Sequence, residues 1–215
     1  MKIKFLGHAS FLITSEKGVK VITDPYKPGC FDGGIQYGPI TEEADIVTIS
    51  HEHDDHNETN MQGNPTFVRD SRAKTIQDIM ITGLDVYHDT NAGKERGSNV
   101  IYNMTIDGIN VVHLGDLGHE LSPDEVKKVG NVDVLLVPVG GYFTMDASAV
   151  DKVISALKPK VIIPMHFKTE KCGFPIAPLG DFVKGKKVEQ KNGEVEITKD
   201  SLPKTTAIFV LHPTK

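Results

Sequence analysis

The chain has 215 residues, of which 39% are hydrophobic and 25% are charged, and its formal net charge is −5. These values predict one soluble globular domain over residues 1–215, and the negative charge argues against nucleic acid as the main substrate. No apolar run approaches membrane-spanning length, and residues 2–6 lead into strand-like sequence without a signal-peptide core, which predicts a cytoplasmic protein.

The first part of the chain is rich in predicted strands. Residues 1–14 alternate loosely and break at Gly7-His8, and after a turn at residues 16–18 a return strand is expected at 19–23. Residues 25–38 are rich in glycine and proline, so they either wall a substrate pocket or form an ordered surface loop. Residues 44–50 read as a buried strand.

The second part alternates strands with helices. Ser122 and Pro123 predict the start of a helix over residues 122–129, and the spacing of apolar residues predicts another over 146–157. Apolar runs predict further strands at residues 66–69, 74–76, 84–88, 100–106, 109–114, 132–137, 160–164 and 207–211. We also expect a helical turn at 58–63, a tight turn at Asp107-Gly108 and a hairpin around Asn192-Gly193. The mixture favours an α/β fold class, with α+β as the alternative.

Three histidines and two aspartates lie within residues 51–56 (HEHDDH), directly after the predicted strand 44–50. His51 and His53 are two apart and point to the same side of an extended segment, whereas Asp55 and His56 follow once the chain has begun to turn. Polar groups rarely gather beside an apolar strand without a partner ion, so we prefer a metal site to a solvated acidic loop. Imidazole suits zinc, iron or copper, and added carboxylate also admits manganese.

Three later residues occupy the same position as His51, at the exit of an apolar strand: His88, Asp116 and His166. This recurrence predicts one shared edge. His113 alternates out of phase with Asp116 and is expected to face away.

Four further polar residues lie near strand ends or bends. His8 and His119 lie at bends. Three roles are open for each of them: contact with substrate, support of a metal ligand, or a purely structural role. Asp24 and Asp89 are candidates to orient a ligand histidine through its other N–H group.

The spacing His-x-His-x-Asp-His over residues 51–56 resembles the signature of the metallo-β-lactamase superfamily of binuclear hydrolases. Over residues 5–168, the Gly-His-Ala-Ser start, the Gly115-Asp116 pair and the Pro-Met-His ending at 164–166 are similar to its small metal-dependent hydrolase branch, related to L-ascorbate 6-phosphate lactonase. The resemblance implies a four-layer αββα sandwich with a metal site at one edge, between two sheets.

The resemblance also implies two divalent metal ions, zinc in the first instance, with manganese or iron as alternatives. The implied ligands of the first ion are His51, His53, His88 and Asp116. The implied ligands of the second ion are Asp55, His56, His166 and the bridging Asp116.

Two bridged cations would lower the pKa of water and generate a hydroxide that attacks a lactone, ester or phosphodiester of a small-molecule substrate. Asp55 is the candidate for orienting this nucleophile. Cys30 and Cys172 are expected to be free thiols without a catalytic role. His53 stands where the diiron flavoprotein branch of the resembled superfamily has glutamate, which disfavours electron transfer.

Two alternatives stay open: a non-catalytic metal-binding or sensing protein of the same fold, and a nuclease or phosphodiesterase. The chain lacks the RNA-gripping insertion of the tRNA 3′-end endonucleases and the second domain of glyoxalase II-type thioesterases. A homo-oligomer is also left open. Five residues are candidate substrate contacts because they lie on predicted loops: Tyr26, Arg96, Tyr142, Phe143 and Lys168.

Overall fold

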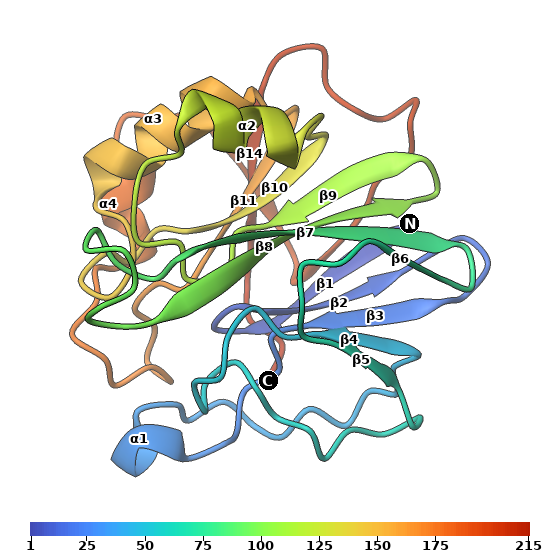
Figure 1. Ribbon diagram of the computed structural model, residues 1–215, viewed down its shortest axis with the longest axis horizontal. Coiled ribbons are helices and arrows are strands. Elements are labelled where there is room, and N and C mark those ends of the chain that lie inside the picture. The colour runs from blue at the N-terminus through green and yellow to red at the C-terminus, as the bar shows by residue number, and fades with distance from the viewer.

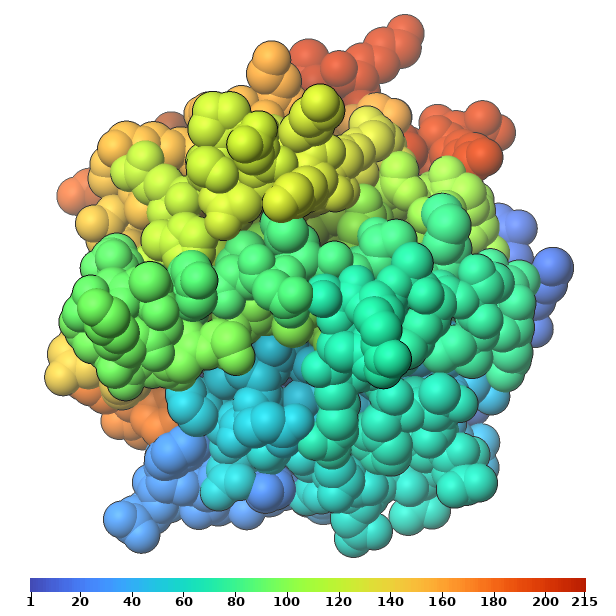
Figure 2. All heavy atoms as spheres, in the orientation of Figure 1, coloured from blue at the N-terminus to red at the C-terminus, as the bar shows by residue number.

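A computed structural model describes the whole chain, residues 1–215. Two β-sheets stack against each other, and α2, α3 and α4 cover the outer face of one of them (Figure 1). One sheet has six strands in the order β13-β1-β2-β3-β4-β5, and the other has eight in the order β12-β14-β11-β10-β9-β8-β7-β6. In the same view, the first third of the chain makes up most of the lower part of the molecule, and later residues lie above it (Figure 2).

The strands are β1 (Lys2–Gly7), β2 (Ser10–Thr14), β3 (Lys20–Thr23), β4 (Ile46–Thr48), β5 (Thr66–Val68), β6 (Lys74–Ile76), β7 (Ile79–Tyr87), β8 (Ser98–Ile106), β9 (Ile109–His113), β10 (Val134–Pro138), β11 (Val161–Met165), β12 (Val188–Lys191), β13 (Glu194–Glu196) and β14 (Ala207–Leu211). The helices are α1 (Cys30–Gly33), α2 (Pro123–Val129), α3 (Ala147–Leu157) and α4 (Leu179–Val183).

The predicted α/β sandwich is confirmed, and its two sheets enclose the main core. Ile3 and Phe5 point from β1 into this core, whereas Ile22 of β3 and Val47 of β4 point to the opposite face of the six-stranded sheet. There they pack under the loop that follows β3, together with Tyr37 and other buried side chains of that loop. The fourth layer of the sandwich is therefore an ordered loop with the four-residue α1, rather than a row of long helices (Figure 1).

Strand direction explains why polar side chains gather at one edge. In the six-stranded sheet β3 and β4 are parallel, and β1 runs in the same direction because both β1 and β3 are antiparallel to β2. In the eight-stranded sheet β9, β10 and β11 are parallel, and β7 shares their direction because both β7 and β9 are antiparallel to β8. The segments that leave these strands therefore come out on common edges of the two sheets.

Both predicted helix starts are confirmed by their caps. The Ser122 side chain accepts a hydrogen bond from the backbone N–H of Glu125, whose carboxylate accepts one from the Ser122 N–H. The Asp146 side chain caps α3 by accepting from the N–H of Ala149. The five-residue α4 was not predicted, because so short a helix leaves little periodicity to detect. None of the helices has the length and hydropathy that crossing a membrane requires.

Two expected elements were wrong. Residues 58–63 form no helical turn, because the Glu58 carboxylate accepts the backbone N–H groups of Thr59 and Asn60 and so replaces helical hydrogen bonds. The hairpin around Asn192-Gly193 does not form either. β12 joins the eight-stranded sheet through β14, whereas β13 joins the six-stranded sheet through β1, so this turn connects the two sheets.

Candidate metal centre

The structure brings all seven sequence-predicted ligands into one cluster at the edge where the strands end. They follow β4, β7, β9 and β11, and they are His51, His53, Asp55, His56, His88, Asp116 and His166. His8 after β1 and Asp24 after β3 lie against the same cluster. All of these residues except His53 are buried.

The donor atoms form three groups, of which one consists of Asp24 with His51 and His56 and the other two contain all the predicted ligands except Asp116. In the first of these two, ligand atoms of His51, His53 and His88 all lie within 4.8 Å of one another. In the second, the same limit holds for His8, Asp55, His56 and His166. These two groups correspond to the two implied ligand sets, with His8 as an addition.

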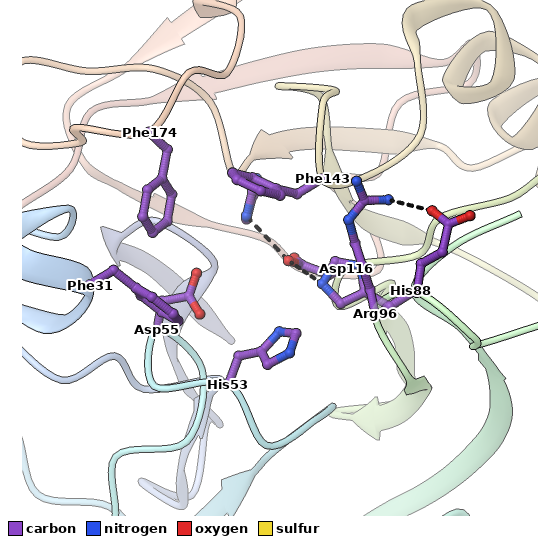
Figure 3. Close-up of a pocket in the computed structure, with 10 residues that line it drawn as sticks. Phe31, His53, Asp55, His88, Arg96, Asp116, Phe143 and Phe174 are labelled. Atoms are coloured by element: carbon purple, nitrogen blue, oxygen red, sulfur yellow. Dashed lines mark ion pairs between the residues drawn. The ribbon is translucent and has the colours of Figure 1, made fainter. Parts of the chain in front are cut away.

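The Asp116 carboxylate is close to imidazoles of both of these groups, and Figure 3 shows it beside His88. Its Oδ2 atom is 3.3 Å from Nε2 of His88, in the first group. The same atom is 3.3 Å from Nε2 of His56 and 3.2 Å from Nε2 of His166, in the second group. Two ligands bonded at about 2.0–2.1 Å to one tetrahedral ion are about 3.3 Å apart, whereas an N–H···O hydrogen bond is typically about 2.9–3.0 Å. The spacing around Asp116 therefore fits ligands that share a cation.

Several buried donor atoms lack any hydrogen-bond partner. They include Nε2 of His51, Nε2 of His56 and Oδ1 of Asp116. An unpaired buried polar atom is costly, and native proteins rarely leave several together. The cluster therefore fits divalent metal ions by its donor types, its spacing and its unpaired atoms.

Asp24 and Ser50 fix which nitrogen of two histidines faces the cluster. Asp24 Oδ2 accepts from the Ser50 hydroxyl at 2.5 Å and from Nδ1 of His56 at 2.9 Å. Because the Ser50 hydroxyl donates to Asp24, it accepts from Nδ1 of His51, 2.9 Å away. Both imidazoles are thus held through Nδ1, and their Nε2 lone pairs are left for a ligand. Asp24 occupies the position expected of a residue that orients ligand histidines.

The electrostatics of the cluster favour bound positive charge. Burial and the neighbouring His56 lower the pKa of His51 to about 3, so its imidazole is neutral at physiological pH. Burial opposes ionisation of Asp55 and Asp116, but the surrounding imidazoles outweigh it and hold the pKa of each carboxyl well below its usual range. Burial also disfavours protonated His56, yet Asp116, Asp55 and Asp24 raise the pKa of that imidazole well above its ordinary value. His51 and the two carboxyls therefore already have the protonation states that metal ligands need, whereas His56 carries a proton that a bound cation would displace.

Asp116 is positioned by a glycine turn and by an asparagine that the sequence analysis missed. Gly115 has φ +54°, and a Cβ atom there would lie 2.2 Å from Oδ1 of Asn99. That oxygen accepts the Asp116 N–H at 3.0 Å, and the Asn99 amide nitrogen donates to the Leu114 carbonyl at 2.9 Å. Asn99 immediately precedes the expected strand 100–106, where nothing in the sequence distinguishes it from an ordinary polar residue.

His8 is part of the cluster, which its sequence position left open. Its Nε2 lies 2.9 Å from Oδ2 of Asp55, and its ring centroid lies 4.2 Å from that of His166. Burial and the neighbouring His166 lower the pKa of His8 to about 4, so the neutral ring donates to the ionised Asp55 carboxylate. His8 therefore supports one of the predicted ligands.

Three further polar residues lie near the cluster without belonging to it. His113 faces away from the predicted ligands, since its Nε2 bonds the Ala9 carbonyl and its Nδ1 accepts from the Gly115 N–H. His119 is structural, because its Nε2 accepts from the backbone of Tyr87 and its Nδ1 lies 2.8 Å from the Glu120 carbonyl. Asp89 does not orient His88, whose Nδ1 has no partner. Its carboxylate instead accepts four backbone N–H groups, from Asn91, Gly93, Glu95 and Arg96.

A cavity of about 260 Å³ opens beside the cluster (Figure 3). It is lined by Phe31, His53, Asp55, His88, Glu95, Arg96, Asp116, Phe143, His166 and Phe174. The expected contacts Arg96 and Phe143 are among these residues. Tyr26 is not, because it is buried with its hydroxyl bonded to the Gly38 carbonyl, and Tyr142 lines a neighbouring hollow.

Lys168 also stays outside the cavity, where it supports the loop of Phe174 by donating to that residue's carbonyl at 2.7 Å. Cys30 and Cys172 are free thiols, as expected.

We compared the chain with known protein families and with known proteins. A profile of the family described as "Beta-lactamase superfamily domain" matches residues 2–166. A UPF0173 metal-dependent hydrolase from Archaeoglobus fulgidus is 29% identical, with 93% of this chain and 96% of the relative covered. One from Thermococcus kodakarensis is also 29% identical, with 79% and 85% covered.

Solved structures agree. The crystal structure of a proposed Zn-dependent hydrolase of the metallo-beta-lactamase superfamily from Thermotoga maritima matches with a TM-score of 0.81 and 35% identity, covering 98% of this chain and 97% of that one. A proposed metal-dependent hydrolase from Parabacteroides distasonis has a TM-score of 0.67 at 20% identity, over 99% and 93% of the two chains, and this likeness concerns the fold alone.

Proposed function

The chain belongs to the metallo-beta-lactamase superfamily, and on this premise we propose that it is a metal-dependent hydrolase with a binuclear centre that acts on a small molecule. We take residues 1–215 as one catalytic domain. The proposal rests chiefly on one observation: Asp116 Oδ2 lies within 3.3 Å of imidazole nitrogens from both donor groups, as a carboxylate shared by two ions requires.

In this proposal His51, His53 and His88 hold one ion, and Asp55, His56 and His166 hold the other. Asp116 completes both sets. The ligand set of imidazoles with two carboxylates suits zinc first, with manganese or iron as the alternatives.

When bound, the metal ions would supply Lewis acidity, which lowers the pKa of water and stabilises negative charge on the attacked group. The residues of the chain orient and shield that chemistry. Asp24 and Ser50 hold His51 and His56 with Nε2 toward the cluster. Asp55 lines the cavity and is fixed by His8, so its carboxylate is placed to orient the nucleophile.

The reaction class we propose is hydrolysis of a lactone, ester or phosphodiester. Two features of the cavity support hydrolysis of a small molecule over a sensing role and over action on nucleic acid. Structural metal sites are usually closed, whereas here the cavity reaches His53, Asp55 and Asp116, which supports catalysis over a purely structural or sensing role. Arg96 is the only lysine or arginine that lines the cavity, which disfavours nucleic acid, since polyanions need several phosphate contacts.

The test measures metal content and hydrolysis on the same sample. Purified protein is analysed for bound metal and then assayed on a lactone panel, carboxylic esters and bis-p-nitrophenyl phosphate, with and without a chelator. We expect two ions per chain, chelator-sensitive hydrolysis of at least one substrate, and loss of both activity and one ion in His53→Ala. His212→Ala, an exposed histidine outside the cluster, is the matched control. Full metal occupancy without hydrolysis of any substrate would instead favour the sensing role.

A further inference from the structure

The cavity beside the metal centre has two chemically different parts. Its only apolar lining residues are Phe31, Phe143 and Phe174, and the only lysine or arginine among its lining residues is Arg96. We propose, resting on the hydrolase function above, that the cavity selects substrates carrying both a flat apolar group, such as an aryl ring, and an anionic group. The three phenylalanines contact the apolar group and Arg96 binds the anion.

The phenylalanines form one continuous wall although they come from separate segments. Phe31 belongs to α1, whereas Phe143 and Phe174 lie on the loops that follow β10 and β11. Ring centroids are 5.7 Å apart between Phe31 and Phe174 and also between Phe143 and Phe174, with interplanar angles of 71° and 74°. Such edge-to-face packing leaves ring faces available for a further aromatic group.

This wall begins at the metal centre. Phe174 also meets the ring of His8 edge-to-face, with centroids 5.7 Å apart, and His8 bonds the predicted ligand Asp55. A group lying on the wall is therefore next to the atoms proposed to carry out hydrolysis.

The wall is also incompletely covered by the chain itself. Phe31 keeps 53% of its surface exposed, and Phe143 and Phe174 are each only partly buried. Apolar surface that a fold leaves in water gains free energy when a ligand covers it. The cavity volume of about 260 Å³ is just below the usual range for ligand pockets, so it suits a small ligand with a single ring.

Arg96 is held at the cavity without a hydrogen-bond acceptor of its own. The four backbone hydrogen bonds to Asp89 fix the loop of residues 91–96, including the Arg96 N–H at 2.8 Å. The Arg96 guanidinium lies 5.8 Å from the Phe143 ring centroid and makes no side-chain hydrogen bond; its ion-pair distance to Glu95 is 4.0 Å. A planar guanidinium with free N–H groups on a rigid loop matches a carboxylate or a phosphate.

Glu95 offers a second test of anion binding, because its carboxylate also lines the cavity and would repel a bound anion. Removing its charge should strengthen binding of the same ligands that removal of the Arg96 charge weakens. Tighter binding without the Glu95 charge and weaker binding without the Arg96 charge are expected together only if an anion binds beside these two residues.

The experiment measures binding by calorimetry, so that it does not depend on turnover. Four non-hydrolysable probes separate the two parts: 3-phenylpropionate, 2-phenylethylphosphonate, butyrate and 3-phenylpropanol. With metal-loaded wild-type protein we expect at least one aryl anion to bind 10-fold or more tightly than both butyrate and 3-phenylpropanol. The first two probes distinguish carboxylate from phosphate-like recognition.

The variants then assign the contacts. Arg96→Gln should weaken the aryl anion 10-fold or more while leaving 3-phenylpropanol within 2-fold, and Glu95→Gln should tighten the anion. Phe174→Ala should weaken binding of the aryl anion and of 3-phenylpropanol and leave butyrate binding unchanged. Arg72→Gln, at an exposed arginine outside the cavity, should change no affinity.

Repeating the Arg96 comparison on metal-free protein separates binding by arginine from binding by the ions. Equal affinity for all four probes, no detectable binding, or insensitivity to Arg96→Gln overturns the inference. None of these results bears on whether the wild-type protein hydrolyses the substrates above.

Discussion

His8 and Asp55 lie 47 positions apart in the sequence, yet Nε2 of His8 is 2.9 Å from Oδ2 of Asp55. Both side chains are buried, and the backbone of His8 has φ +56°, a left-handed conformation that few non-glycine residues adopt. Strain of this kind is retained where surrounding structure enforces it, often at functional sites. We therefore propose that His8 orients Asp55 toward the second ion of the proposed centre.

Replacing His8 tests this role. His8→Leu removes the donor to Asp55, and loss of such a supporting hydrogen bond typically costs about 10–100-fold in metal affinity. We expect a decrease of this size at the second ion only, measured by competition with a chromophoric chelator. His8→Gln, which keeps an N–H donor, should recover part of the affinity. Unchanged affinity in His8→Leu would remove His8 from the site.

Asp116→Asn tests the shared carboxylate. Because Oδ2 of Asp116 lies close to histidines of both donor groups, the neutral amide should weaken both ions together. Metal analysis of the purified variant should find well below one ion per chain, with hydrolysis reduced at least 100-fold. A variant that lost one ion and kept the other would mean that Asp116 does not bridge.

Gly140 tests how closely the fold holds His166. A Cβ atom at Gly140 would lie 2.3 Å from the His166 carbonyl oxygen, so Gly140→Ala must displace backbone. We expect a loss of about 1–3 kcal/mol in the free energy of unfolding, together with weaker metal binding. Gly180→Ala is the matched control, because nothing lies within 4 Å of its added Cβ. Urea denaturation of both variants measures the difference, and equal stabilities would contradict the packing argument.

Asp89 gives a pH-dependent prediction for the loop that carries Arg96. Burial raises the pKa of Asp89, but its backbone hydrogen bonds outweigh burial and hold the pKa at about 2, below the ordinary value of 3.8. A lowered folded-state pKa stabilises the protein above the unfolded value, and this stabilisation is lost as the pH falls toward 2.

Wild type should therefore melt at a higher temperature than Asp89→Asn at pH 5, and the gap should narrow progressively from pH 4 to pH 2. Thermal melts at several pH values measure this gap. A gap independent of pH would mean that the Asp89 charge does not stabilise the loop.

Much of this architecture could be predicted from the sequence because its signals are local. Apolar runs flanked by glycine and proline located most strands, and the polar residues at their exits, such as His51 and His166, indicated a common edge. Contacts between residues far apart in the sequence were not predicted, because local sequence patterns carry no information about them. Asn192-Gly193 has the sequence of a hairpin turn, but only the paired strands determine that it connects two sheets. Likewise, nothing beside His8 in the sequence indicates Asp55 as its partner.

We propose above that two cations share the Asp116 carboxylate at this edge of the sandwich. The most direct test is a crystal structure of the zinc-loaded protein with anomalous data collected at the zinc absorption edge. We predict two anomalous peaks on opposite sides of Asp116, one within about 2.0–2.2 Å of nitrogens of His51, His53 and His88 and the other equally close to His56 and His166. A single peak, or peaks that leave Asp116 uncoordinated, would contradict the account.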